Sequence, residues 1–259
     1  MRLRRSDPTS AGLRRVRRGK GFAFVDADGS PVDAETRERL RALVVPPAWQ
    51  DVWLCPFPNG HIQAVGTDDA GRRQYLYHEQ WTATRSAQKH DRIRELAVRL
   101  PRVREQLSRD LRRRSLDRER VLAVALRLLD AGLFRTGGEE YEQEHGSHGV
   151  STLLREHVVV SKDELAFRFP AKSGVLREAT VVDPAIARVV RSLKRSRTGF
   201  DRLLCYRAAD GWHEVRADDV NDRFKELAGE AYTVKDLRTW AATVSAAVAL
   251  AQAPEPVTK

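Results

Sequence analysis

Residues 118–133, RERVLAVALRLLDAGL, form the most apolar helical stretch of the chain, and the rest of the fold can be placed around them. A helix of this composition is expected to run through a hydrophobic core. Asp117 stands directly before it and is predicted to cap its first turn. Residues 79–99 and 102–113, which precede it, are polar with scattered apolar positions and predict two further helices.

Downstream of this helix the pattern changes to strands and then to an alternation of helices and strands. HVVVS, ELAFRFP and VLREATVV predict three strands, with turns at Lys162-Asp163 and at Lys172-Ser173-Gly174. The remaining elements are expected as a helix at 183–195, a strand at 202–207, a helix at 216–229 and a helix at 234–251. The segment AATVSAAVAL of the last helix is small and apolar, so burial is expected for it.

Upstream, the sequence is rich in strand and turn signals. FAFVDADGSPVD predicts a strand that enters a turn, and residues 34–44 predict a helix with Asp33 as its N-cap. The runs DVWLCPF, HIQAVG and RRQYLYH predict further strands. The chain is therefore expected to be an α+β protein. Residues 1–78 would form a small, mostly antiparallel β domain, and residues 79–259 a mainly helical domain with a small inserted sheet.

Charge points to a polyanionic partner. The 259 residues carry 46 Lys and Arg against 36 Asp and Glu, a net charge of +10, which favours nucleic acid or an anionic membrane. No apolar run approaches the roughly 20 residues that a spanning helix needs, and the start, MRLRRSDPTS, lacks the apolar core of a secretory signal. A cytosolic, nucleoid-associated protein that binds DNA is expected.

Two further features of composition bear on the chemistry. Cys55 and Cys205 are expected to be buried and reduced, and the cysteines and histidines show no metal-ligand spacing, so no metal site is expected. Residues 1–20 carry eight basic residues against one acid, Asp7. They could form a solvated, partly disordered arm or an arm that follows phosphates, and the sequence does not decide between the two.

Three cationic residues stand in short polar contexts. Arg135 follows the apolar helix, where Gly137 and Gly138 are expected to break it, and a favourable interaction with the helix dipole is its alternative explanation. Lys172 lies at a hairpin tip, where most lysines are simply solvated. Arg238, with Lys235, lies in the first turns of the last helix. Cations there oppose the macrodipole, which indicates either function or an ion pair with Asp236.

Six segments in order resemble the type IB DNA topoisomerases of the bacterial and poxvirus-like kind. They are VPPAWQDV (45–52), GHIQA (60–64), DAGRRQYLYH (69–78), FRTGGEEY (134–141), AKSG (171–174) and KDLRTW (235–240). The resemblance runs from about residue 20 to residue 251. It implies the fold of the DNA breaking–rejoining enzymes, double-stranded DNA as substrate, a monomer, and neither ATP nor another cofactor.

The resemblance also implies roles for particular residues. Arg135 and Arg238 would bind the nonbridging phosphate oxygens, and Lys172 would protonate the leaving 5′-oxygen. The strand with Arg73, Gln74, Tyr75 and Tyr77 would lie in the DNA major groove, where Gln can bond an adenine edge. Core packing is the alternative for Tyr75 and Tyr77. Lys235 is expected to contact DNA as well.

One departure concerns the nucleophile. The family's nucleophilic tyrosine, and the histidine that contacts a phosphate oxygen, lie beyond the position of Lys259. We therefore expect a truncated form that binds DNA without cutting it. A tyrosine recombinase shares the chemistry, but it usually carries His-x-x-Arg where this chain has Lys235-Asp236-Leu237-Arg238, and a helical arm domain. A non-catalytic basic nucleic-acid-binding protein is the other alternative.

Overall fold

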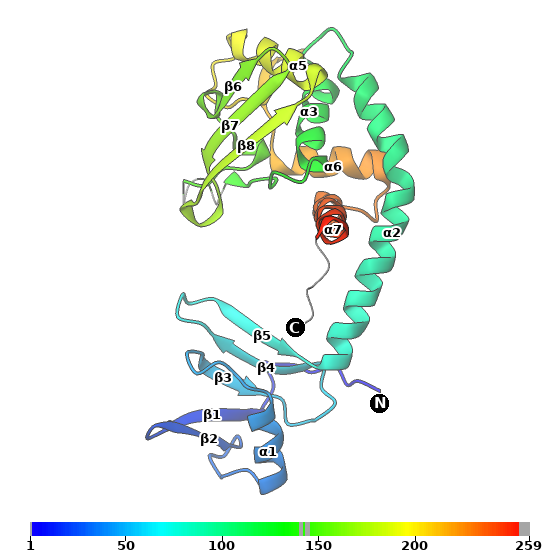
Figure 1. Ribbon diagram of the computed structural model, residues 1–259. Coiled ribbons are helices and arrows are strands. Elements are labelled where there is room, and N and C mark those ends of the chain that lie inside the picture. Colours follow the sequence, from blue (N-terminus) through cyan, green and yellow to red (C-terminus); the bar gives the residue numbers. More distant parts are fainter. Residues whose placement is uncertain (1, 140–141, 143–145, 254–259) are drawn as a thin grey trace. The chain divides into compact units, whose positions relative to one another are not determined.

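The computed structural model describes residues 2–139, 142 and 146–253 and confirms the α+β class (Figure 1). The chain divides into two compact units, Met1–His90 and Asp91–Lys259. The change from strands to helices that the sequence predicts at residue 78 coincides with the start of the long helix α2 (Glu79–Asp110). The boundary between the two units lies further along that helix. The first turns of α2 belong to the N-terminal unit because Trp81 packs edge-on against the ring of His61 at 4.8 Å.

The N-terminal unit is built on a five-stranded antiparallel sheet. Its order is β2-β1-β3-β4-β5, with β1 (Leu13–Arg18), β2 (Gly21–Val25), β3 (Gln50–Leu54), β4 (Ile62–Thr67) and β5 (Arg73–Tyr77). A disordered N-terminal arm is wrong for Leu13–Arg18, which form β1 within this sheet. This strand is rich in arginine, and Arg15 is held in it by hydrogen bonds. Its guanidinium donates to three backbone carbonyls, those of Val45, Pro46 and Trp49.

Helix α1 (Ala34–Ala42) covers one face of this sheet, as the sequence predicts. Asp33 caps it by accepting a hydrogen bond from the Thr36 amide at 2.8 Å. Leu40 of α1 is buried with Val52, Leu54 and Ala64 of the sheet in a small core. Successive side chains of a strand point to opposite faces of the sheet, so every second residue of β5 faces this core and the others face away from it.

Helix α2 is continuous, whereas two helices interrupted near Pro101 were expected from the sequence. A proline inside a helix removes one backbone hydrogen bond and crowds the preceding turn. The helix tolerates this because an apolar stripe continues on both sides of Pro101. Its buried members are Ile93, Leu96, Leu100, Val103 and Leu107. The spacing of three and four residues keeps them on one face, so burial outweighs the local penalty.

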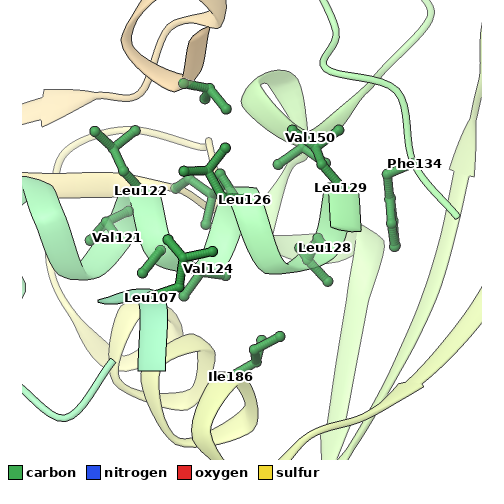
Figure 2. Close-up of a cluster of buried hydrophobic side chains, with 14 of the residues drawn as sticks. Leu107, Val121, Leu122, Val124, Leu126, Leu128, Leu129, Phe134, Val150 and Ile186 are labelled. Carbon is green, nitrogen blue, oxygen red and sulfur yellow. The ribbon is translucent and has the colours of Figure 1, made fainter. Parts of the chain in front are cut away.

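The C-terminal unit is arranged around α3 (Arg118–Asp130), which confirms the central helix that the sequence predicts. Asp117 caps α3, and every residue from Val121 to Leu129 is buried except Arg127. Figure 2 shows the core side chains around this helix, including Leu107 of α2 and Ile186 of α5. The other helices of the described unit are α5 (Pro184–Arg195), α6 (Ala217–Ala228) and α7 (Val234–Gln252).

Two small antiparallel sheets complete this unit. The predicted three-stranded sheet has the order β6-β7-β8, with β6 (Val158–Ser161), β7 (Glu164–Pro170) and β8 (Leu176–Val182). A hairpin of β9 (Cys205–Ala208) and β10 (Gly211–Glu214) forms the second. The sequence did not predict β10, which begins at Gly211, a glycine with a φ of +138°.

The second half of α7 is exposed, so its expected burial is wrong. Val234, Asp236, Leu237 and Ala241 are buried, but the residues from Ala242 to Leu250 face solvent, and Leu250 is 78% exposed. A run of alanines signals high helix propensity, which by itself does not require burial. Cys55 and Cys205 are buried and free, as expected. In the described part of the chain, no helix is long and apolar enough to cross a membrane.

Shortening a core side chain of α3 tests its central place. Leu126→Ala removes a fully buried side chain and should lower the free energy of unfolding by about 2–5 kcal/mol. Val98→Ala is the matched control, because Val98 of α2 is 82% exposed and the substitution should have little effect. Urea unfolding followed by circular dichroism measures both. Equal destabilisation by the two changes would contradict a core built on α3.

Candidate active site

A pocket of about 250 Å³ in the C-terminal unit brings the three candidate cations together. Its lining consists of Arg135, Thr136, Gly137, Gly138, Ser147, His148, Lys172 and Arg238. A neighbouring pocket shares Arg135, His148, Lys172 and Arg238 with it. Arg135 follows α3, Lys172 lies between β7 and β8, and Arg238 lies on α7. Three separate parts of the sequence therefore meet here, while the roles of the three side chains stay predictions.

Arg135 is positioned by the end of α3 and by a buried phenylalanine. The helix ends at Asp130, with Gly132 in the left-handed region at φ +75°, and not at Gly137-Gly138 as the sequence suggested. Phe134 is buried against the rings of Phe167 and Phe169 at 4.8 and 5.9 Å. This anchor leaves Arg135, the next residue, to line the pocket.

The turn after Arg135 is clamped onto residues 149–151. The carbonyl of Arg135 accepts a hydrogen bond from the Val150 amide, and the carbonyl of Thr136 accepts one from the Ser151 amide, both at 2.8 Å. Gly149 approaches this turn so closely that a Cβ on it would lie 2.3 Å from the Gly137 nitrogen. Glycine is required there because the neighbour that would have to move is backbone.

Lys172 is carried by a tight connection between β7 and β8. Ser173 and Gly174 both have positive φ, at +68° and +71°, and the Ala171 amide donates to the Val175 carbonyl at 2.8 Å. This hydrogen bond closes the turn that carries Lys172. The side chain of Lys172 is exposed and lines both pockets.

Arg238 faces another cation, and within the described residues no ion pair with a carboxylate involves it. Burial lowers the pKa of Arg238, and the charge of Arg135 lowers it further. Asp236, the carboxylate that the sequence offered as a partner, instead accepts from Arg92 at 2.6 Å and from Thr233. The alternative prediction of an ion pair between Arg238 and Asp236 is therefore wrong. The two guanidiniums raise each other's energy, and an anion placed between them would relieve this repulsion.

His148 belongs to the pocket, although the sequence analysis did not identify it. Its Nδ1 lies 2.7 Å from the Thr152 carbonyl oxygen, which can only accept, so Nδ1 carries the proton. Glu142 lies 3.5 Å from the same nitrogen. In the neutral ring Nε2 is then an acceptor, and in the protonated ring it is a fourth cationic donor. No spacing motif marked this residue.

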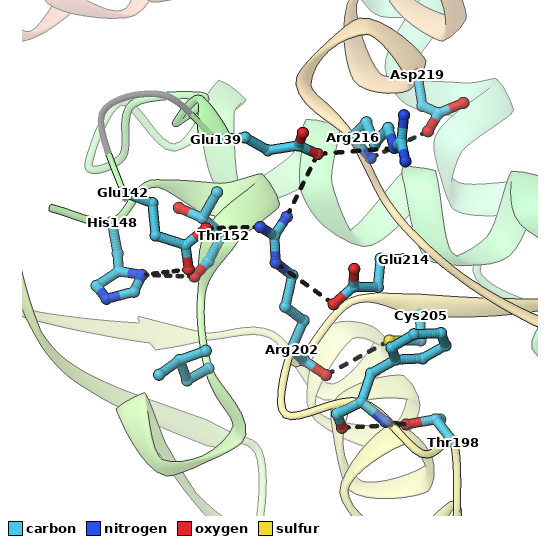
Figure 3. A network of polar contacts seen from close by, with 12 residues as sticks. Glu139, Glu142, His148, Thr152, Thr198, Arg202, Cys205, Glu214, Arg216 and Asp219 are labelled. Atoms are coloured by element: carbon cyan, nitrogen blue, oxygen red, sulfur yellow. Dashed lines mark hydrogen bonds and ion pairs between the residues drawn. The ribbon is translucent and has the colours of Figure 1, made fainter. Parts of the chain in front are cut away.

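A network of ion pairs centred on Arg202 reaches His148 through Glu142 (Figure 3). Arg202 is 14% exposed and contacts three carboxylates, those of Glu142 at 2.6 Å, Glu214 at 3.5 Å and Glu139 at 3.8 Å. A guanidinium with this little exposure needs such compensation. Through Arg202, the network therefore joins Glu139 and Glu142 to Glu214 of β10.

The predicted DNA-binding residues lie elsewhere. Arg73, Tyr75 and Tyr77 share the exposed face of β5, where the tyrosine rings are stacked at 6.1 Å and are 41% and 47% exposed, so core packing does not explain them. Gln74 has the opposite parity, and its amide donates to Asp68 at 2.8 Å. Lys235 is exposed on α7 and does not line the pocket.

The tyrosines of this unit do not line the pocket where the structure describes them. Tyr232 is buried and donates its hydroxyl proton to Glu95 at 3.2 Å. Tyr206 stacks on His213 in the β9–β10 hairpin at 5.4 Å. Tyr141 lies outside the described residues.

Gly149→Ala tests the close approach that positions Arg135. The added Cβ forces the Gly137 backbone to move, so the free energy of unfolding should fall by about 1–3 kcal/mol. Gly21→Ala is the control, since a Cβ there meets nothing within 4 Å. Urea unfolding of both variants is the measurement. An unchanged midpoint for Gly149→Ala would show that the turn is not packed as described.

Comparison with known proteins identifies the family. The model of the eukaryotic DNA topoisomerase I catalytic core matches residues 78–259, and that of the bacterial DNA topoisomerase IB N-terminal domain matches residues 21–68. The chain is 30% identical over 239 residues to DNA topoisomerase 1B of Acanthamoeba polyphaga mimivirus, covering 90% of this chain and 70% of that protein. It is 32% identical over 121 residues to DNA topoisomerase 1B of vaccinia virus (strain Copenhagen), covering 45% of this chain and 37% of that protein. These matches decide against a tyrosine recombinase, and the chain belongs to the type IB DNA topoisomerases, which are isomerases.

Proposed function

We propose that this chain binds duplex DNA and holds one phosphodiester among Arg135, Lys172 and Arg238. The observation that carries the proposal is their convergence on a single pocket whose described lining contains no carboxylate. A phosphodiester carries the negative charge that would satisfy all three groups. The mutual repulsion of Arg135 and Arg238 makes this gain larger, because the anion removes an unfavourable contact as it forms favourable ones.

The two arginines suit the transition state of phosphoryl transfer. Attack on phosphorus places extra negative charge on the nonbridging oxygens, and a guanidinium is permanently charged with its N–H donors in one plane. Arg135 and Arg238 are carried by separate elements, so each can approach a different oxygen. The packing of these elements sets the backbone position of each arginine before DNA arrives, and such preorganisation favours electrostatic catalysis.

Lys172 is the proposed general acid. In the cleavage step a tyrosine hydroxyl loses its proton to solvent as its oxygen attacks phosphorus, and the bond from phosphorus to the 5′-oxygen breaks. That oxygen would leave as a poor leaving group unless a proton reaches it, and a lysine ammonium carries one at neutral pH. Ligation runs the same steps backwards. The phosphotyrosyl bond retains the energy of the bond that broke, so ATP is not required.

His148 adds a fourth group to the proposed phosphate site. With Nδ1–H held by the Thr152 carbonyl, Nε2 is the nitrogen left for a ligand. Glu142 lies on the Nδ1 side, and a ring that carries both protons would place a further donor, Nε2, beside the phosphate. Arg202, which is mostly shielded from solvent, donates to Glu142 and so supports the carboxylate beside the imidazole.

The N-terminal sheet is the proposed second contact with DNA. Arg73, Tyr75 and Tyr77 present one cation and two stacked rings on the exposed face of an edge strand. An edge strand can enter the major groove, where arginine reads guanine and a tyrosine hydroxyl bonds phosphate. Gln74 would have to leave Asp68 before it could read a base.

Replacing Arg238 tests the phosphate site. Arg238→Ala removes one phosphate contact, so affinity for a duplex should fall several-fold, and the slope of log affinity against log salt should decrease by about one. Arg112→Ala is the control, since Arg112 is exposed and does not line the pocket. Fluorescence anisotropy across a salt series measures both. Equal losses for the two variants would count against a dedicated site.

A second experiment addresses strand cleavage. Because Tyr206 and Tyr232 do not line the pocket, we propose that the 259-residue chain binds DNA without cutting it. Incubation with a nicked suicide substrate should give no covalent protein–DNA adduct on a denaturing gel, while anisotropy shows binding. A stable adduct would refute this. If one forms, its loss in Tyr141→Phe would identify Tyr141 as the nucleophile.

A further inference from the structure

The first residues of the chain are fastened to the loop that precedes β4. The Arg4 amide donates to the Asn59 carbonyl at 2.8 Å, and the His61 amide donates to the Arg4 carbonyl at 2.9 Å. The Ser6 hydroxyl donates to the Ile62 carbonyl at 3.1 Å. The arginines at positions 4 and 5 are therefore carried by fixed backbone.

These residues form one side of a pocket of about 350 Å³ within the Met1–His90 unit. The pocket is lined by Leu3, Arg4, Arg5, His61, Trp81 and Arg85. Trp81 and Arg85 come from the first turns of α2, one helical turn apart and thus on the same face. The pocket shares no residue with the one that contains Arg238.

The polar groups of this pocket are oriented as donors. The guanidinium of Arg4 lies 3.6 Å above the ring of Phe57, and that of Arg85 lies 4.6 Å above the ring of Trp81. Stacking on a ring face leaves the N–H groups, which lie in the guanidinium plane, available at its edge. Arg85 uses one of them on Gln88 at 3.3 Å.

His61 adds a further donor. Its Nδ1 accepts the Ser6 backbone N–H at 2.8 Å, so in the neutral ring the proton is on Nε2. The ring meets Trp81 edge-on, at an interplanar angle of 70°. The side chains of three arginines and one histidine thus offer donors, and no side chain in this lining is a carboxylate.

Other arginines of the same long helix are used differently. Arg92, Arg104 and Arg109 of α2 each form an ion pair, with Asp236, Asp130 and Glu105 respectively. Across residues 2–139, 142 and 146–253, no ion pair involves Arg4, Arg5 or Arg85. These three arginines therefore have no carboxylate partner among those residues, and their charge is available to an external anion.

We infer that this pocket binds a phosphate group, and that the backbone of a DNA strand supplies it. Guanidinium forks match the oxygens of phosphate in geometry and charge. The volume lies at the small end of the roughly 300–1,000 Å³ that ligand pockets span, which suits one phosphate and its sugar. The inference rests on the proposed function and adds a phosphate contact distinct from the one at Arg238.

The test compares two variants that each lose two positive charges from the same unit. Arg5→Gln/Arg85→Gln removes two pocket donors, whereas Arg18→Gln/Arg41→Gln removes two exposed arginines outside it. The pocket variant should bind a labelled duplex several-fold more weakly, with the salt slope reduced by about one unit beyond the control. All four positions are exposed, so thermal unfolding should not change.

A second arm identifies the source of the phosphate. The indole N–H signal of Trp81, assigned with Trp81→Phe, is followed by NMR during titration with the duplex and with inorganic phosphate. The duplex should shift it at far lower concentration. A shift with inorganic phosphate while the pocket variant keeps full DNA affinity would overturn the inference in favour of a small-anion pocket. Full affinity in the variant with no shift at all would overturn it outright. Absence of DNA binding by the wild-type chain would instead refute the proposed function.

Discussion

The structure around the pocket depends on keeping Arg135 and Arg238 near each other without a carboxylate between them. Burial lowers the pKa of Arg238, and the like charge of Arg135 lowers it further because the two cations repel each other. The fold must therefore supply the energy that holds them. Their repulsion is a property of the unliganded protein, and a bound phosphate would convert it into affinity.

The energy comes from packing that does not involve the charges. α3 is buried along almost its whole length, and Phe134 anchors the chain that leaves it. Gly149 allows the backbone of Gly137 to approach closely enough for two amide–carbonyl bonds to close the turn. These apolar and backbone contacts position the backbone of Arg135, so its side chain is available to a ligand.

Several carboxylates of this unit are paired with arginines that do not line the pocket. Within the described residues, Asp236 is held by Arg92, Asp183 by Arg127 and Asp110 by Arg223, with the closest atoms at 2.6, 2.7 and 2.7 Å. Glu142 is held by Arg202 in the same way. These pairs keep the four acids engaged with arginines outside the pocket lining. A chain with this many acidic residues can thus keep a strongly cationic site.

The sequence predicted what depends on local pattern and missed what depends on tertiary contacts. α3, its Asp117 cap and the β6–β7–β8 sheet follow from composition and turn residues, and Lys172 and Arg238 could be singled out by their contexts. Helix α2 passes through Pro101 because an apolar stripe continues beyond it, and in β1 the guanidinium of Arg15 donates to three carbonyls of the segment between α1 and β3. His148 enters the pocket only because Thr152 and Glu142 orient its ring. Such partners are distant in sequence or lack a motif, so a single sequence cannot reveal them. Helix α2, Arg15 and His148 escaped prediction because what decides each of them is a contact that forms only after the chain has folded.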